Sequence, residues 1–206
     1  MDTFSILAKN IKMNEIKVLS ELDEEQINQS IDVFIEGFYD FFSSISKDKG
    51  KLHRLFKNSF DYDMSYAYLH DGEAVGFLGL SNYQKRPLRL NKEIFMETMG
   101  GFAGKISYKA MCSALEKPSV FSPKEICIDF IATSSHYRSQ GIGKQLIQFV
   151  RNTLGYKIVE LEVYSNNPRA REFYQNEGFK VAKTKKDLMS KIQGFGDCII
   201  MRWEAE

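Results

Sequence analysis

The stretch at residues 130–146, FIATSSHYRSQGIGKQL, constrains the fold of this chain more than any other. It begins with apolar residues, continues with polar residues and glycine, and ends with the composition of a helix. This order predicts a strand that runs through a turn into a helix. Residues 138–144 contain no proline, so every backbone N–H there can donate, and Gly141 and Gly143 let a ligand approach the main chain closely.

Such a turn can hold an anion, because the helix that follows directs its unpaired N–H groups and the positive end of its dipole toward it. The spacing excludes two nucleotide motifs. A dinucleotide fingerprint needs a third glycine where Leu146 stands, and a Walker loop needs a glycine at Arg138 and a Ser or Thr at Gln145. The turn therefore indicates a pyrophosphate in some other ligand.

A second motif, NPRAREFYQNEGF, occupies residues 167–179. Asn167 is a suitable cap for a helix, Pro168 is tolerated at the first helical position, and Gly178 can end the helix in a left-handed conformation. Phe173 and Tyr174 then lie on one face of a short helix. The motif predicts a capped helix that presents two aromatic rings.

Taken together, the two motifs, their order and the helix and strand between them resemble the GNAT superfamily of acyl-CoA N-acyltransferases. The resemblance covers residues 125–185. It implies an α/β (α+β) fold with a mixed, largely antiparallel central sheet, one parallel pair of strands that splay apart, and helices on both faces. It also implies that acetyl-CoA is the cofactor and that its pantetheine arm lies in the opening between the splayed strands.

The local patterns agree with that fold. Strands are expected at 16–19, 64–70, 73–80, 125–133, 157–164, 179–183 and 198–203, and helices at 24–42, 47–57, 141–154 and 168–177. Asp23 can cap the first helix, Gly37 interrupts it, and Asp71-Gly72 is a strong hairpin signal. The lysine-rich run at 180–186 is predicted as a solvated edge strand.

The segment at about 81–123 departs from the family pattern, because about forty residues stand where a short connection would suffice. Helices are expected at 91–99 and 106–115, with a loose glycine-rich stretch at 100–104. The insertion is either a lid or wall for the acceptor site, hinged at the glycines, or else a peripheral insertion or one that forms a homodimer. The chain as a whole, 1–206, is predicted to be a single acyltransferase domain with this insertion.

The resemblance assigns cofactor binding residue by residue. Backbone groups of the strand that carries the thioester are expected to bind the pantetheine and the developing oxyanion, and the turn is expected to bind the pyrophosphate. The residues assigned are Ile131, Ala132, Thr133, Arg138, Ser139, Gln140, Gly141, Ile142, Gly143, Lys144, Asn167 and Tyr174.

Acyl transfer to an amine needs a base, because most amines are protonated at pH 7. Asp129 is the first candidate: it is the one charged side chain between Ile126 and Ser135, and an acid among apolar neighbours has a raised pKa unless it is paired. Glu125 is the second candidate. The alternatives are a water-mediated route and a purely structural Asp129 that neutralises a nearby Lys or Arg.

Tyr174 corresponds to the tyrosine that in this family often stands beside the sulfur of the cofactor. A phenol is a weaker acid than a thiol, so we expect Tyr174 to act through a hydrogen bond to the leaving thiolate. The alternative is an aromatic ring that only packs beneath the cofactor.

The acceptor is the least defined part of the prediction. Glu36, Tyr39 and Asp40 lie where the family places substrate contacts, and two acids there would suit a cationic amine. The predicted function is N-acetyl transfer to a primary amine of a small molecule or peptide, by direct attack in a ternary complex. The alternative is an inactive module that senses acyl-CoA.

Composition narrows the partners. Twenty-eight basic and twenty-seven acidic residues give a net charge of +1, which provides no attraction to nucleic acid or to anionic membranes. No uncharged apolar run is long enough to span a bilayer, and Cys112, Cys127 and Cys198 lack the spacing of a disulfide framework or a metal site. We expect a cytoplasmic protein with no metal, nucleic-acid or membrane partner.

Overall fold

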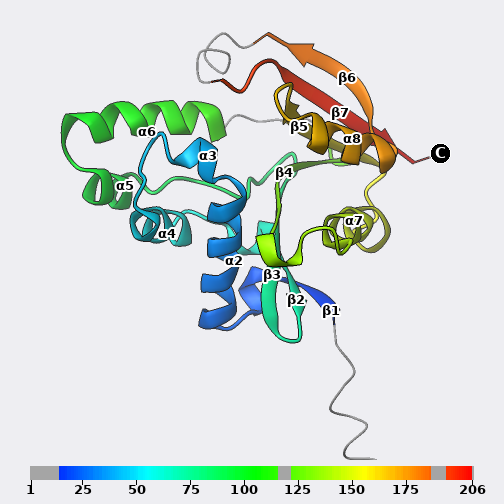
Figure 1. The fold of residues 1–206 in the computed structure, drawn as a ribbon, viewed down its shortest axis with the longest axis horizontal. Helices are drawn as coiled ribbons and strands as arrows, with labels where there is room; N and C mark the ends of the chain where they lie inside the picture. The colour runs from blue at the N-terminus through cyan, green and yellow to red at the C-terminus, as the bar shows by residue number, and fades with distance from the viewer. Residues whose placement is uncertain (1–13, 116–121, 187–193, 206) are drawn as a thin grey trace, which may run out of the picture.

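The structure is a computed structural model that describes residues 14–115, 122–186 and 194–205. Seven strands form one sheet in the order β1-β2-β3-β4-β5-β7-β6 (Figure 1). β4 and β5 are parallel, and every other neighbouring pair is antiparallel, which confirms the predicted mixed sheet. The strands are β1 (Asn14–Val18), β2 (Ser65–His70), β3 (Glu73–Ser81), β4 (Glu125–Thr133), β5 (Ile158–Tyr164), β6 (Lys180–Lys185) and β7 (Cys198–Glu204).

Helices cover both faces of this sheet, and Figure 1 shows α7 and α8 on the side opposite α2. One face carries α2 (Glu24–Gly37), α3 (Tyr39–Phe42), α4 (Lys49–Lys57), α5 (Lys92–Met99) and α6 (Gly101–Leu115). The other carries α7 (Ile142–Gln148), which continues as a π-helix (η4, Phe149–Thr153), and α8 (Pro168–Asn176). Short 3-10 helices lie at Leu19–Glu21 (η1), Tyr62–Met64 (η2) and Ser135–Tyr137 (η3).

Each face has its own apolar core. On the α2 side, the ring of Phe34 packs against the six other phenylalanine rings around it at centroid distances of 4.8 to 5.3 Å, which brings α2, α4 and the middle of the sheet together. On the α7 side, Leu146, Val150 and Leu161 are almost fully buried with Tyr174. Both long motifs of the sequence therefore contribute to the second core.

Local signals explain most element boundaries. Asp23 and Gln26 form a capping box at the start of α2. Asp71 and Gly72 have φ values of 53° and 85°, as a type I′ hairpin turn requires. Gly155, with φ 72°, follows the helical stretch that begins with α7.

The insertion differs from its prediction in one respect. Both helices exist, but α6 begins at Gly101, so the glycine-rich stretch expected to be loose is mostly helical. The break between the helices is at Gly100, where φ is 68°. Glycine adopts a positive φ at little cost. This one residue is enough to change the chain direction between α5 and α6.

Candidate functional site

The parallel strands β4 and β5 part halfway along their length. Their pairing ends at Ile128 opposite Leu161, although β4 continues to Thr133 and β5 to Tyr164. Beyond Ile128, β4 is paired only with β3. The splayed pair predicted from the sequence is confirmed, and the edge of β4 that faces β5 is open to an extended ligand.

Asp129 stands at the point where the strands part. Gly79 of β3 lies opposite Phe130, but Leu80 lies opposite Ile128, so β4 contains one extra residue there. This is a β-bulge, a feature that bends a strand and redirects its side chains and is frequent beside active sites. The bulge places Asp129 at the lip of the opening.

The carboxyl group of Asp129 is nearly buried, with 11% of its side chain exposed. Burial raises its pKa, while the charge of Arg86 and hydrogen bonds from Ser81 and Cys127 oppose that rise. The Ser81 hydroxyl donates to Oδ2 of Asp129, and Nε of Arg86 lies 3.9 Å from the same oxygen. Arg86 is thus the cation that a purely structural Asp129 would neutralise. The raised pKa of Asp129 is also what a general base would need, so both predicted roles agree with the structure.

Arg86 also contacts the insertion. Its Nη2 donates to the carbonyl oxygen of Leu115 at the end of α6, at 3.2 Å. One arginine therefore connects Leu115 at the end of the insertion to Asp129 at the opening. This position agrees with a wall or lid; whether the insertion also forms a dimer stays a prediction.

The turn after β4 has the geometry of an anion site. Ser139 and Gly141 have φ values of 64° and 81°, and no side chain caps the N-terminus of α7. The first helical hydrogen bond runs from Gln145 N–H to the Gly141 carbonyl. Within the described ranges, the backbone N–H groups of residues 139–144 have no hydrogen-bond partner. They fit a pyrophosphate.

Two of the residues assigned to the cofactor, Ala132 and Ile142, have buried side chains, so only their main-chain groups are available to a ligand. Ala132 is buried. A Cβ built on Gly37 of α2 would lie 2.6 Å from the Cβ of Ala132, so α2 packs closely against β4 at this point. Ile142 is buried in the core beneath α7. In contrast, Arg138, Gln140 and Lys144 are exposed, as phosphate contacts would be.

The helix α8 lies directly against the turn. The Asn167 side chain accepts a hydrogen bond from Ala170 N–H at 3.0 Å, as predicted for a cap. A Cβ on Gly143 would meet the Phe173 ring at 3.2 Å, so glycine there lets the two motifs pack closely. Tyr174 is 8% exposed, and burial raises the pKa of its phenol. A phenol that is harder to ionise favours the hydrogen-bonding role.

The three predicted acceptor residues have different surroundings. Oε1 of Glu36 accepts a hydrogen bond from Ser135 N–H at 3.1 Å, which places it where β4 leads into the turn. The Tyr39 hydroxyl donates to the Lys47 carbonyl at 3.0 Å. Asp40 is exposed on α3. Of the three, Glu36 has a direct contact with the segment that leads into the anion turn.

Glu125 lies at the paired end of β4, away from the bulge. Its Oε1 is 3.1 Å from Arg202, which also binds Glu160 at 2.8 Å and Glu204 at 2.6 Å. Four residues of extended chain, roughly 13 Å, separate Glu125 from Asp129. The structure does not bring these two candidate bases together.

The sequence analysis missed Glu162, which follows Leu161 at the end of the β4–β5 pairing. Its charge acts on Asp129 and raises the pKa of that carboxyl further. Lys185 binds Glu162 with an N–O distance of 3.1 Å. An alternation of acidic and apolar residues at 158–164 was the available signal, but the register that ends at Leu161 opposite Ile128, and so brings the next residue Glu162 near Asp129, is not readable from the sequence.

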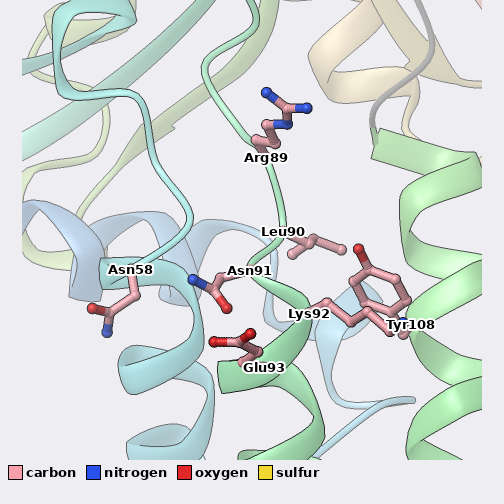
Figure 2. Close-up of a pocket in the computed structure, with 7 residues that line it drawn as sticks. All are labelled: Asn58, Arg89, Leu90, Asn91, Lys92, Glu93 and Tyr108. Atoms are coloured by element: carbon pink, nitrogen blue, oxygen red, sulfur yellow. The ribbon is translucent and has the colours of Figure 1, made fainter.

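An open hollow of about 450 Å³ lies elsewhere, between the end of α4, the segment before α5, and α6. Figure 2 shows Arg89, Asn91 and Tyr108 around it. No residue predicted for the cofactor or the base lines this hollow.

None of the described helices has the length and apolar character of a bilayer span. The described side chains include no cluster of metal ligands.

Comparisons with known structures identify the same fold. An N-acetyltransferase from Staphylococcus aureus Mu50 is 12% identical, with a TM-score of 0.59 over 92% of this chain and 100% of its own. The ribosomal-protein-S18-alanine N-acetyltransferase of Escherichia coli is 16% identical, with a TM-score of 0.53 and coverage of 93% and 94%. A GNAT acetyltransferase from Elizabethkingia anophelis, solved with acetyl-CoA bound, is 13% identical, with a TM-score of 0.52 and coverage of 96% and 100%.

The family itself is identified by its sequence model. The model of the acetyltransferase (GNAT) family matches residues 31–179, while a comparison with curated protein sequences gives no match. The chain therefore belongs to the GNAT acetyltransferase family, which confirms the predicted resemblance. Acetyl-CoA is the cosubstrate of this family, and the open turn and strand edge described above fit it.

Proposed function

We propose that this GNAT acetyltransferase transfers the acetyl group of acetyl-CoA to a primary amine of a small molecule or peptide, by direct attack in a ternary complex. One observation carries the proposal: β4 and β5 part at a bulge that presents Asp129, a buried carboxyl of raised pKa. The opening leads to a turn whose backbone N–H groups are unpaired within the described chain. The proposed base and the turn proposed to bind the cofactor are thus both connected to β4.

The chain's own groups would hold the cosubstrate as follows. Backbone N–H groups of residues 139–144, with Arg138 and Lys144, receive the pyrophosphate at the start of α7. The open edge of β4 from Ile131 to Thr133 pairs with the pantetheine amides as a neighbouring strand would. Asn167 keeps its amide nitrogen for the ligand while its oxygen caps α8.

Acetyl-CoA supplies a thioester carbonyl, which an unprotonated amine can attack. Asp129 takes the proton of the acceptor's ammonium, a task for which a raised pKa is better suited than that of an ordinary surface carboxylate. Backbone N–H groups at residues 131–133 stabilise negative charge on the carbonyl oxygen. The Tyr174 hydroxyl donates a hydrogen bond to the departing sulfur and stays protonated, because burial raises its pKa.

The acceptor is placed on the α2 side of the opening, where Glu36 and the insertion lie. The E. coli protein of the same fold is named for the alanine of ribosomal protein S18, which favours testing peptide N-termini first. We also propose a cytoplasmic location, since the buried thiols Cys127 and Cys198 form no disulfide with any described residue.

The test combines binding with turnover. Thermal shift with acetyl-CoA, CoA, ATP and NAD should show stabilisation by acetyl-CoA and CoA, of roughly 2.7 kcal/mol at one hundred times the dissociation constant. CoA release is then measured with peptide N-termini, polyamines and arylamines. Release with one amine class supports the transferase. Binding without release from any class would instead favour the alternative, an inactive acyl-CoA sensor.

A further inference from the structure

An ammonium group of the protein itself is paired with Glu162, the residue that follows the last β4–β5 pair. Lys185 is the last residue of β6, and its Nζ is 3.1 Å from Oε1 of Glu162 across the intervening strand β7. The two side chains are each 49% exposed. The pair is therefore on the surface of the sheet and can rearrange without disturbing a core.

Asp129 and Glu162 are the first residues of β4 and β5 after the two strands part. Ile128 and Leu161 form the last β4–β5 pair, and Asp129 and Glu162 follow them. Lys185 interacts electrostatically with Cys127 of β4, and the Cys127 thiol donates a hydrogen bond to Asp129. The amino group that Glu162 holds therefore lies on the side of the sheet where the base candidate stands.

The electrostatic contacts agree with this placement. Burial lowers the pKa of Lys185, but the hydrogen bond and charge of Glu162 raise it, with smaller contributions from the thiols of Cys198 and Cys127. Cys127 also donates a hydrogen bond to Asp129, and Glu162 acts on Asp129 through its charge. Lys185 and Asp129 therefore share two neighbours, one on β4 and one on β5.

We propose that Lys185 is an internal acceptor, which the protein acetylates from its own bound acetyl-CoA. The inference rests on the proposed function of the same site. Glu162 is then the residue that holds the amino group to be acetylated, and Lys185 occupies the position that the ammonium of an external acceptor takes.

The step balances with acetyl-CoA as the only co-reactant. The ammonium of Lys185 gives one proton to Asp129, and its nitrogen forms a bond to the thioester carbonyl carbon. The carbon–sulfur bond breaks, CoA leaves as the thiolate, and the thiolate takes up the second proton, which the nitrogen loses as it becomes an amide. Because pairing with Glu162 favours the charged amine, the reaction is a slow, single event on each molecule. It removes the charge of Lys185 and leaves Glu162 available to an external cation.

Lys183 provides a matched control. It lies two residues earlier on the same exposed strand and in the same row as Glu162, since both are opposite Ile200 of β7. Among the described side chains it is nevertheless Lys185 that makes the ion pair with Glu162. Chemical acetylation in solution should modify both lysines alike. Only a reaction guided by the site should distinguish Lys185 from Lys183.

The experiment incubates the full chain with acetyl-CoA and follows acetylation of each lysine by peptide mass spectrometry. Lys185 should be acetylated at least about tenfold faster than Lys183, because it is held next to the reacting group. Its rate should not change with protein concentration, since donor and acceptor share one molecule. Glu162→Gln and Asp129→Asn should each reduce that rate to the level of Lys183, and Lys183→Arg should leave it unchanged.

Acetyl-CoA binding and CoA release with external amines are measured on the same sample. If acetyl-CoA binds and an external amine is acetylated while Lys185 reacts no faster than Lys183, the internal acceptor is wrong and the transferase stands. If acetyl-CoA does not bind at all, the proposed function fails first. A rate that rises with protein concentration would also overturn the proposal, because it indicates acetylation between molecules.

Discussion

The two faces of the sheet offer different atoms to a ligand. On the α7 and α8 face, the turn after β4 offers main-chain N–H groups, and Gly141, with open space at its Cβ position, allows close approach. On the α2 to α6 face, the opening offers side chains: Asp129 from β4, Arg86 from the insertion and Glu162 from β5. The α7 and α8 face thus offers main-chain groups, which nearly every residue has. The α2 to α6 face offers the side chains of particular residues.

This difference explains what each face is suited to. Main-chain donors recognise a pyrophosphate whatever chain surrounds them, so the cofactor side can stay constant across a family. Side chains brought together from several segments can be exchanged one at a time, so the acceptor side can change. The described helical part of the insertion, up to Leu115, belongs to the second face and is joined to it through Arg86.

Removing the carboxylate at the bulge should give the largest effect and separate the faces most sharply. Asp129→Asn should lower kcat by about 10²- to 10⁴-fold, the usual contribution of a general base. Acetyl-CoA affinity should stay unchanged, because the anion turn is intact. Stopped-flow turnover and calorimetric binding measure the two quantities. Near-normal turnover would make Asp129 a structural partner of Arg86 and Ser81.

Tyr174→Phe tests the side chain of the α8 face for which we propose a catalytic role. Loss of a hydrogen bond to a charged sulfur corresponds to roughly 1.5–3 kcal/mol, so kcat should fall about 10- to 100-fold. Because burial raises the pKa of Tyr174, the wild-type profile should show no basic limb from its ionisation at the ordinary phenol pKa. An unchanged kcat would leave the ring with a packing role only.

Gly141→Ala tests the main-chain grip, and Gly155→Ala is its control. Both glycines have positive φ, 81° and 72°, with open space at the Cβ position, so each substitution should cost about 1–2 kcal/mol of folding stability. Only Gly141→Ala should weaken acetyl-CoA binding, by about tenfold, or 1.4 kcal/mol. Equal loss of affinity in both variants would show that strain alone, and not the turn, controls binding.

Arg86→Gln should give the smallest effect, a displacement of the pH profile. The positive charge of Arg86 lowers the pKa of Asp129, so its removal raises that pKa. The base must be deprotonated to act, and the acid limb of kcat/KM should therefore move to higher pH. The exposed Arg89, which no contact joins to Asp129 among the described residues, provides the control as Arg89→Gln. An acid limb at the same pH in both variants would contradict Asp129 as the titrating group.

The same contrast separates what the sequence predicted from what it did not. The strand, turn and helix after residue 130, the cap at Asn167 and the hairpin at Asp71-Gly72 follow from neighbouring residues, and the structure contains all of them. The family resemblance supplied the splayed pair. The partners of Asp129 could not be read in this way. Ser81 and Glu162 come near it through the register of three strands, and Arg86 comes near it through the path of the segment that follows β3.

Glu125 illustrates the same limit in the opposite direction. It stands four residues from Asp129 in the sequence and was the second candidate base, yet the pairing of β5 with β7 brings Arg202 to it. A charge near a motif in the sequence can thus be paired with a residue far along the chain. Side-chain chemistry on the acceptor face depends on such pairings, whereas the main-chain chemistry of the turn does not.

Hydrogen exchange of the backbone amides at residues 139–144, with and without acetyl-CoA, tests the central claim most directly. In the structure these N–H groups have no partner within the described chain, so they should exchange rapidly in the absence of ligand and become protected when acetyl-CoA binds. Protection there, together with protection along β4 at 131–133, is the predicted result. Binding of acetyl-CoA that leaves both segments unprotected would contradict the account.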